Sequence, residues 1–404
     1  MTIDEQVQLL MQGTEYGDEE LKQAMAGELR QRLVEAQAEG RPLRVYCGFD
    51  PRTSDLHLGH TVPMRKLRQF QELGHEVTFL VGNYTSLIGD PSDQDRLRPL
   101  LTPEQVEINA RTYAEQAYKI LDREKTLIRH NADWLSKLSF ADLINLASNF
   151  TIQQFLTREN FRLRWEKGDP VYLHETFYSI MQGYDAYAMR SDVQVGGTDQ
   201  LFNIVTAARK IMTSLGEKPN IAIILGILPG TDGEVKMSKS LGNHIPLLST
   251  PEDMYGKVMS VPDKAMGQFF RLVTRWTPPM IAELESGMAG GSLHPRDVKM
   301  RLAHEIVSIY HDEASAAQAE QAFVRVFQRG DLPEDMPELL LQDGQTVLDV
   351  LVAGMLVSSK SEGRRLIDQH GVRLDGEVLT DPSQPFPRAG VLQVGKRKYL
   401  RVKI

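Results

Sequence analysis

Two histidines near residue 58 form the first motif suited to chemistry on phosphate groups. His57 and His60 stand in the sequence His-Leu-Gly-His, which follows an apolar run at 45–49 and opens an amphipathic pattern at 58–73. This order predicts strand, loop and helix. The N-terminus of such a helix favours an anion, and Gly59 lets a ligand approach the backbone. Two histidines at a helix start can also be a cap or a surface feature, so this motif alone does not decide a function.

A second motif, Lys-Met-Ser-Lys-Ser at 236–240, places two lysines around a small hydroxyl residue in a glycine-rich loop. In this order the two motifs resemble the HIGH and KMSKS signatures of class I aminoacyl-tRNA synthetases. The resemblance implies that His57 and His60 stabilise phosphates while the α-phosphorus of ATP is attacked. It also implies that Lys236 and Lys239 close over the leaving pyrophosphate.

Polar and aromatic residues share one face of a helix predicted before residue 190. Tyr178, Gln182 and Asp185 are spaced at i, i+4 and i+7, so they lie on one side of that helix. A solvated face is the alternative interpretation. A phenolic amino acid needs a carboxylate for its ammonium and a buried donor–acceptor pair for its hydroxyl. The residues that offer these groups are Tyr46, Asp90, Tyr178, Gln182, Asp185 and Gln200.

The series YCGFDP, HLGH, GDPS, YxxxQxxD, GGTDQ and KMSKS, in this order, is similar to bacterial-type tyrosyl-tRNA synthetases over nearly the whole chain from Val45. The resemblance implies that tyrosine and ATP are the substrates. The residues implied to bind tyrosine are Tyr46 and Asp185 at the phenolic hydroxyl, Asp90, Tyr178 and Gln182 at the ammonium, and Gln200 near the carboxylate. Those implied to bind ATP are Cys47, Gly48, Asp50, His57, Gly59, His60, Gly197, Asp199, Lys236 and Lys239.

Simpler interpretations remain open for some of these positions. Cys47 can be a small buried strand residue, and Asp50 before a proline can be a turn residue. The pair Gly196 and Gly197 can serve only a turn. After Ser92, residues 93–98 depart from the family pattern of Gly and a basic residue, so no phosphate contact is assigned there. The arginines that could serve instead are Arg96 and Arg98.

Strands alternating with helices predict an α/β fold with a doubly wound, parallel, Rossmann-like sheet. We expect strands near residues 45, 77, 127, 193 and 224, in the spatial order 3-2-1-4-5. Ligands bind such sheets beyond the carboxyl ends of the strands, where the strand order reverses. Three motifs follow strands one, four and five, so we expect them to meet in one crevice: HLGH, GGTDQ and KMSKS.

Composition limits the class of protein. The chain has 404 residues, of which 41% are hydrophobic and 25% charged, as in ordinary globular enzymes. No apolar run suits a membrane span and the acidic N-terminus lacks a secretory pattern, so we expect a cytoplasmic protein. The single cysteine excludes an intramolecular disulfide framework and a cysteine-based zinc cluster. We expect no protein-bound metal, only Mg²⁺ that accompanies ATP.

Charge and composition also divide the chain into expected domains. Residues 345–404 carry ten Lys/Arg against six Asp/Glu, a net charge of +4 on a chain whose total is -8. This tail resembles an RNA-binding module shared with a small-subunit ribosomal protein, and a structural cap is its alternative. The expected domains are a catalytic domain with a helical lead-in (1–245), a helical domain binding the anticodon arm of tRNA (246–330), a linker (331–344) and an RNA-binding domain (345–404).

Three functional hypotheses follow. The first is tyrosine activation by ATP and transfer to tRNA(Tyr), with a homodimer implied only by the resemblance. The second is a related enzyme that activates another aromatic amino acid such as tryptophan. The third is an RNA-binding paralogue that has lost catalysis. The intact motifs HLGH, GGTDQ and KMSKS weigh against the third, and Tyr46 with Asp185 favours a phenolic substrate over tryptophan.

Overall fold

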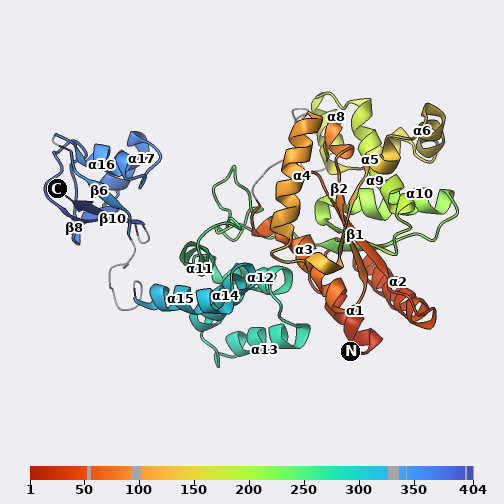
Figure 1. The fold of residues 1–404 in the computed structure, drawn as a ribbon, viewed down its shortest axis with the longest axis horizontal. Coiled ribbons are helices and arrows are strands. Elements are labelled where there is room, and N and C mark those ends of the chain that lie inside the picture. The colour runs from red at the N-terminus through yellow and green to blue at the C-terminus, as the bar shows by residue number, and fades with distance from the viewer. Residues whose placement is uncertain (52–55, 92–101, 326–335, 343, 396–397, 404) are drawn as a thin grey trace. The chain divides into compact units, whose positions relative to one another are not determined.

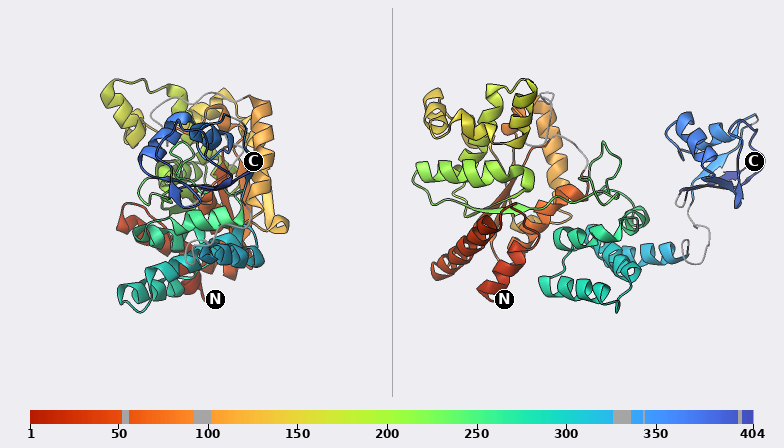
Figure 2. Two further views of the ribbon diagram at one scale, coloured as in Figure 1. Left: turned by 90° about the vertical axis from the view of Figure 1, so that its left-hand side faces the viewer. Right: turned by 180° about the vertical axis from the view of Figure 1, so that it is seen from behind.

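The computed structural model describes residues 1–51, 56–91, 102–325, 336–342, 344–395 and 398–403. Two units make up the chain, Met1–Ala317 and Gln318–Ile404, and each is described by itself (Figures 1 and 2). Several positions considered above lie outside the described residues. They are Arg96 and Arg98, the other residues of the 93–98 loop, much of the predicted linker at 331–335 and 343, and two basic residues of the tail, Lys396 and Arg397.

The first unit is built on a parallel sheet of five strands in the order β3-β2-β1-β4-β5, which confirms the predicted doubly wound fold. Every pairing in this sheet is parallel, and Val45 at the centre lies beside Val77 on one side and Val193 on the other. The strand order reverses between β1 and β4. The strands are β1 (Arg44–Phe49), β2 (Glu76–Val81), β3 (Thr126–His130), β4 (Val193–Gly197) and β5 (Ile221–Leu225).

Helices cover both faces of this sheet (Figure 1). Helix α3 (Leu58–Glu72) starts at its cap residue His57, and Gly74 follows its end with a φ of +85°, a value that suits glycine. Helix α4 (Pro103–Ala117) begins after its cap residue Thr102. The remaining helices of the sheet region are α5 (Ala132–Leu135), α6 (Phe140–Ala147), α7 (Ile152–Leu156), α8 (Glu159–Lys167), α9 (Leu173–Ala188), the π-helical turn η4 (Phe202–Ala208) and α10 (Arg209–Ser214).

The first forty residues, whose role the sequence does not reveal, close one edge of the sheet. Between helices α1 (Ile3–Met11) and α2 (Glu19–Ala38), Thr14 forms an antiparallel bridge with Leu225 at the end of β5. The ammonium of buried Lys66, on α3, donates hydrogen bonds of 3.1 Å and 3.0 Å to the carbonyl oxygens of Leu9 and Gln12. The lead-in therefore covers the edge strand and is tied to the helix that carries the two histidines.

In the first unit, residues 251–317 are helical, as predicted, and these helices gather beside the sheet (Figure 2). The hydroxyl of Tyr310, in this group, lies 2.7 Å from the hydroxyl of Thr61 on α3, and both residues are buried. None of the described helices is long and apolar enough to cross a membrane. The helices of this group are α11 (Pro251–Met259), α12 (Met266–Val273), α13 (Pro278–Ala289), α14 (Pro295–Tyr310) and α15 (Glu313–Val324).

The second unit packs two helices, α16 (Val347–Ala353) and α17 (Lys360–Asp368), with its own five-stranded sheet in the order β6-β10-β9-β7-β8. One of its strands, β6 (Glu338–Leu340), falls within the segment predicted as a linker and pairs in parallel with β10. This strand has only three residues and its partner lies about sixty residues later in the chain, so no local sequence pattern predicts it. The other strands are β7 (Val372–Leu374), β8 (Glu377–Val378), β9 (Gly390–Val394) and β10 (Lys398–Lys403).

Candidate active site

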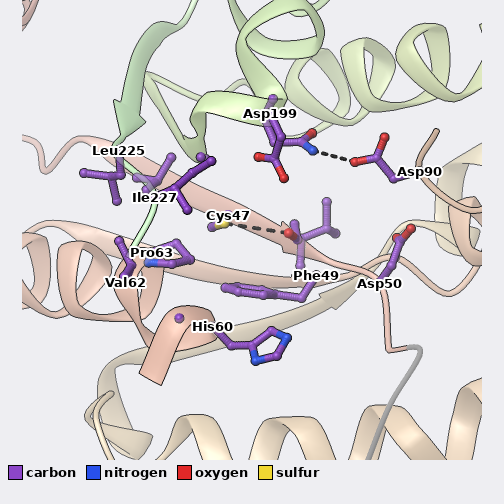
Figure 3. A pocket seen from close by; sticks show the side chains of 18 of the residues that line it. Cys47, Phe49, Asp50, His60, Val62, Pro63, Asp90, Asp199, Leu225 and Ile227 are labelled. Carbon is purple, nitrogen blue, oxygen red and sulfur yellow. Dashed lines mark hydrogen bonds between the residues drawn. The ribbon is translucent and has the colours of Figure 1, made fainter. Parts of the chain in front are cut away.

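A cavity of about 650 Å³ opens at the carboxyl ends of β1, β4 and β5, where the strand order reverses. Figure 3 shows side chains around it from β1, from α3 and from the loop after β4. All the predicted site residues except Lys239 line this cavity, and Lys239 is exposed on the neighbouring loop. The lining residues among them are Tyr46, Cys47, Gly48, Asp50, His57, Gly59, His60, Asp90, Tyr178, Gln182, Asp185, Gly197, Asp199, Gln200 and Lys236.

At one end of the cavity, buried polar groups lack partners. Neither the hydroxyl of Tyr46 nor Oε1 of Gln182 has a hydrogen-bond partner among the described residues, although both atoms are buried. An unsatisfied buried polar group costs about 1–3 kcal/mol, so such groups in a cavity wall point to a polar ligand. Burial, with the nearby charge of Asp185, raises the pKa of the Tyr46 hydroxyl well above its usual value, so this group stays a neutral phenol.

Asp185 is fixed by two donors that the sequence did not single out. Nε1 of Trp134 donates to its Oδ1 at 2.7 Å, and Nδ2 of Asn131 donates to its Oδ2 at 3.2 Å. Burial nevertheless raises the pKa of Asp185 to about 8, so the carboxyl group is mostly protonated at pH 7. A neutral carboxyl beside a neutral phenol can exchange hydrogen bonds with a ligand hydroxyl without burying a net charge.

The carboxylate of Asp50 lies between two hydroxyl donors. Tyr178 donates to its Oδ2 at 3.1 Å and Thr85 donates to its Oδ1 at 2.9 Å. A Cβ at Gly82 would lie 2.2 Å from Oδ1 of Asp50, so only glycine fits beside this carboxylate. Asp50 is therefore held by side-chain hydrogen bonds, a role beyond that of the turn residue considered above.

A chain of hydrogen bonds runs from the cavity wall into the protein. Gln200 donates from Nε2 to Asp90, and its Oε1 accepts a 2.9 Å hydrogen bond from Asn203. Asn203 in turn accepts at 2.7 Å from Ser179, whose hydroxyl accepts at 2.9 Å from Arg158. This chain fixes the orientation of the Gln200 carboxamide and of the Asp90 carboxylate next to it (Figure 3).

The hydrogen bonds at the start of α3 set the tautomers of the two histidines. Nδ1 of His57 accepts the backbone N–H of Gly59 at 3.2 Å, and Nδ1 of His60 accepts the backbone N–H of His57 at 3.2 Å. A backbone N–H can only donate, so in each neutral ring the proton is on Nε2. The ring centroids are 3.9 Å apart. The pair therefore offers two neighbouring N–H donors.

Both imidazole rings are neutral at physiological pH. Burial, with the neighbouring rings and lysines, lowers the pKa of His57 to about 3. Burial and the charges of Lys236 and Lys239 lower the pKa of His60 to about 4. An anion in this part of the cavity would thus be bound by neutral N–H donors from the histidines and by ammonium groups from the loop.

The loop that carries the lysines is tied to the histidine segment by its backbone. The N–H of Leu58 donates to the carbonyl of Ile245 at 3.0 Å, and the N–H of Leu247 donates to the carbonyl of Leu56 at 2.9 Å. On the opposite wall, Nζ of Lys236 lies 3.6 Å from Oδ2 of Asp199. These contacts bring the three motifs after β1, β4 and β5 together, as predicted from the strand order.

Steric limits explain the two glycines that end β4. Neither has a positive φ, so the turn itself does not require glycine at either position. A Cβ at Gly196 would meet Cδ1 of Ile204 at 2.5 Å, and a Cβ at Gly197 would meet Oδ1 of Asp199 at 2.8 Å. Close packing, rather than turn geometry, is therefore the reason for both residues.

The comparisons with known proteins agree with this geometry. Residues 38–328 match the family model of class I tRNA synthetases (W and Y), and residues 348–388 match the S4 domain. A tyrosine–tRNA ligase of Moorella thermoacetica is 47% identical over 93% of this chain and 91% of its own length. A tyrosine–tRNA ligase of Thermotoga maritima is 46% identical over 89% of this chain and 90% of its own length.

The chain belongs to the tyrosine–tRNA ligase family of class I tRNA synthetases. Solved structures agree on the fold. A truncated mitochondrial tyrosyl-tRNA synthetase of Aspergillus nidulans superposes with a TM-score of 0.59 at 24% identity, covering 74% of this chain and 89% of that one. The Archaeoglobus fulgidus tyrosyl-tRNA synthetase complexed with L-tyrosine superposes with a TM-score of 0.59 at 22% identity. The match covers 79% of this chain and 100% of that one.

In this member of the tyrosine–tRNA ligase family, the site also includes residues that were not predicted from the sequence. Asn131 follows β3 directly, and Trp134 lies on the short helix after it, so the rule that sites form at carboxyl ends of strands could have identified both. Tyr113, on α4, also lines the cavity, with its ring edge-on to His60. The sequence around Thr85 contains no motif that would identify it as a site residue.

Proposed function

We propose that the protein is a tyrosine–tRNA ligase, which activates L-tyrosine with ATP and transfers it to the 3′-terminal adenosine of tRNA(Tyr). The observation that carries the proposal is the buried end of the cavity. There an unpartnered phenol, Tyr46, accompanies a carboxyl group, Asp185, that two donors hold in place. A pocket built to hydrogen-bond a substrate hydroxyl rejects analogues that lack it, a rule for which tyrosyl-tRNA synthetases are the usual example.

Tyrosine would lie with its phenol toward this end of the cavity. Tyr46 and Asp185 would exchange hydrogen bonds with the hydroxyl, in line with the neutral state that burial gives both groups. Oε1 of Gln182, buried and without a partner among the described residues, would accept from the substrate's ammonium. The other residues proposed for tyrosine are Asp90 and Tyr178 at the ammonium and Gln200 near the carboxylate.

ATP would lie with its phosphates at the start of α3. The Nε2–H groups of His57 and His60 would donate to phosphate oxygens, and the absence of a side chain at Gly59 lets the phosphates approach the backbone. Lys236 and Lys239 would neutralise the charge of the leaving pyrophosphate. The residues proposed for the ribose side are Cys47, Gly48, Gly197 and Asp199, with Asp50 nearby.

The proposed chemistry needs no protein nucleophile. The tyrosine carboxylate attacks the α-phosphorus of ATP, the bond to the β-phosphate oxygen breaks, and pyrophosphate leaves with its Mg²⁺. A ribose hydroxyl of the tRNA then attacks the carbonyl carbon of the mixed anhydride and displaces AMP. The protein contributes position and fixed charge, which stabilise the transition state most where the donors are already oriented. The hydrogen-bonded histidine pair meets that condition.

The second unit is proposed to bind tRNA through its basic residues. Three arginines, Arg364 and Arg365 on α17 and Arg373 on β7, are exposed. No ion pair joins any of them to another described residue, whereas Lys360 is paired with Asp349 at 2.8 Å. Unpaired cations on a surface are available to phosphates, and the match to an S4 domain supports an RNA partner.

We also infer a cytoplasmic homodimer. Five large apolar side chains that are more than half exposed lie between residues 140 and 173. Exposed apolar side chains that form a contiguous patch are typical of protein–protein interfaces, and we infer that these five contribute to one. Substituting glutamate for two of them should shift the sedimentation velocity from dimer to monomer, and a wild-type monomer would contradict the inference. The five are Phe140, Ile144, Ile152, Trp165 and Leu173.

Charging of tRNA tests the proposed function as a whole. Purified protein is incubated with ATP, Mg²⁺, total bacterial tRNA and one radiolabelled amino acid, either tyrosine, phenylalanine or tryptophan. We expect acid-precipitable label with tyrosine alone. Equal label with tryptophan would favour a related aromatic specificity, and no label with any of the three, in protein that binds tRNA, would favour a paralogue without catalysis.

A further inference from the structure

The loop that carries Lys236 and Lys239 is held in shape by two residues outside the motif, Asp232 and Asn243. We propose that Asn243, braced by Asp232, is a positioning residue for adenylate formation: it fixes the backbone of residues 236–240 so that both lysines face the phosphates. The inference rests on the proposed function, because that function assigns the lysines to the leaving pyrophosphate.

Asp232 organises the turn that enters the motif. Its Oδ1 accepts hydrogen bonds of 2.8 Å from the backbone N–H groups of both Glu234 and Val235. Across the turn, the N–H of Gly230 donates to the carbonyl of Val235 at 2.8 Å, and Pro229 forms an antiparallel bridge with Lys236. The remaining oxygen of Asp232, Oδ2, accepts from Nδ2 of Asn243, so the turn is tied to the segment that leaves the motif.

Asn243 reaches across the loop from its far end. Its Oδ1 accepts the backbone N–H of Ser238 at 2.8 Å, and Ser238 is the residue between Met237 and Lys239. Its Nδ2 also lies 3.3 Å from the carbonyl oxygen of Lys236. One buried carboxamide therefore contacts the backbone of the motif on both sides of Met237 and the carboxylate of Asp232.

The loop is built around this carboxamide. A Cβ at Gly230 would lie 2.2 Å from Nδ2 of Asn243 and 2.3 Å from its Cγ, so glycine is required there to make room. The backbone carbonyl of Asn243 also accepts the N–H of Thr231 at 2.8 Å. The hydrogen bond from Asn243 helps to hold the pKa of Asp232 below its ordinary value, so Asp232 is ionised at neutral pH.

The substitution Asn243→Asp keeps the shape and the acceptor for Ser238 but replaces the donor by an oxygen facing the Asp232 carboxylate. Like charges at this distance repel, so the loop should open. We expect adenylate formation to slow on the order of 10²-fold, as for reacting groups misplaced by about 1 Å. Binding of tyrosine, measured without ATP, should stay unchanged.

Exchanging the two groups should restore the hydrogen bond. In the double variant Asp232→Asn, Asn243→Asp, the carboxamide introduced at position 232 keeps an oxygen for the two turn N–H groups and directs its amide toward the new carboxylate. We expect the double variant to recover most of the rate, while each single variant stays slow. A residue that matters only for overall stability would not show this reciprocal rescue.

Trypsin provides a readout that does not depend on activity. It cleaves after Lys236 and Lys239, and an opened loop presents these bonds to the protease more often. Cleavage at these sites, identified by mass spectrometry, should be faster in the single variants than in the wild type and slow again in the double variant. The variant Asp18→Asn is a matched control, since Asp18 also accepts two backbone N–H groups at a helix start far along the chain.

The outcomes separate this inference from the proposed function. Wild-type rates and wild-type cleavage in folded Asn243→Asp protein would overturn the brace, and so would single variants that are slow but not rescued by the exchange. A wild-type protein without tyrosine-dependent adenylate formation would instead overturn the proposed function. Cleavage of the four proteins would then still decide whether the pair shapes the loop.

Discussion

The indole Nε1 of Trp134 donates a 2.7 Å hydrogen bond to Oδ1 of Asp185, which joins the short helix after β3 to the last turn of α9. Nδ2 of Asn131 donates to the other oxygen, Oδ2, so both carboxyl oxygens accept hydrogen bonds from the side of β3, and neither bond involves the hydroxyl of Tyr46. That hydroxyl has no partner among the described residues. This buried hydroxyl is therefore available for a hydrogen bond with a ligand in the cavity.

The first prediction follows from this unpartnered hydroxyl. In Tyr46→Phe, the preference for tyrosine over phenylalanine should fall by about tenfold or more, because about 1.4 kcal/mol of selective hydrogen bonding corresponds to a factor of ten. Without ligand the same change removes an unsatisfied group, so the free energy of unfolding should stay equal or rise. The measurements are kcat/KM for both amino acids in pyrophosphate exchange and denaturant unfolding.

Asp185→Asn is the companion variant, with circular dichroism to confirm folding. Together with Tyr46→Phe it should weaken the discrimination further. Undiminished selection of tyrosine by the folded double variant would show that the phenol pocket lies elsewhere.

The second prediction concerns the histidine pair. His57→Asn keeps an acceptor for the N–H of Gly59 but removes the Nε2–H donor. Adenylate formation should slow by on the order of 10²–10³, the usual effect of losing one preorganised donor. Tyrosine binding should change little. Stopped-flow measurement of the first turnover checks the rate, and His60→Asn and Lys239→Ala should behave alike.

A matched variant separates catalysis from helix capping. His57→Ala removes the cap as well, so it should unfold more easily than His57→Asn by about 1 kcal/mol while both are equally slow. Normal first-turnover rates in His57→Asn, His60→Asn and Lys239→Ala would refute the catalytic role of the three residues.

The third prediction is a pH dependence. The folded protein holds the pKa of His57 at about 3 and of His60 at about 4, against 6.5 for a free imidazole. Between these values the unfolded chain binds protons that the folded protein does not. The contribution of the two histidines to the free energy of unfolding is therefore fully present above pH 6.5 and decreases as the pH drops toward 4 and 3. Substituting both with asparagine should therefore reduce the loss of unfolding free energy between pH 7 and pH 5.

Catalysis should follow the same protonation. The two rings stay neutral well below pH 6, so kcat/KM for adenylate formation should show no inflection near pH 6.5 caused by them. An inflection at 6.5 that disappears in His57→Asn would mean that the ring titrates as if exposed.

The fourth prediction separates the two half-reactions. A chain ending after Val324 keeps α15 whole and removes the second unit's sheet entirely, including β6. Adenylate formation should continue at close to the full-length rate, while tRNA charging falls strongly. The salt dependence of tRNA affinity should also weaken, by roughly one unit of slope for each phosphate that the truncated chain no longer binds. Pyrophosphate exchange and charging are compared at two salt concentrations.

Full-length protein with Arg364→Gln and Arg365→Gln serves as a control without truncation. It should lose tRNA affinity in the same direction but less. Unchanged affinity and salt dependence in the truncated chain would make the tail a structural cap.

The strands of the large sheet could be predicted because short sequence segments identify them. The strands β1, β2 and β5 are largely apolar segments bounded by turn residues, and β5, apolar at every position, is buried on both faces. The expected strand order then predicted that the motifs following β1, β4 and β5 meet in one crevice, and they do. β6 could not be predicted, since three residues in a Pro-rich and acidic segment acquire strand geometry only from pairing with β10.

The site was predictable where a residue sits in a spaced motif or directly after a strand, as with Asp185 and His57. It was not predictable where a contact joins segments far apart in the sequence. Thr85 beside Asp50 and Trp134 beside Asp185 are such cases, because nothing in the local sequence of either donor indicates its acceptor. The tautomers of the histidines likewise depend on backbone geometry that residue types do not specify.

Amino-acid-dependent exchange of pyrophosphate into ATP tests the central claim most directly. The full-length protein is offered each of the twenty standard amino acids in turn, with ATP, Mg²⁺ and labelled pyrophosphate, and no tRNA. Our account predicts exchange with tyrosine and only a small fraction of that rate with phenylalanine, since phenylalanine leaves Tyr46 and Asp185 unpaired. Exchange that is faster with any other amino acid, or absent with all twenty, would contradict it.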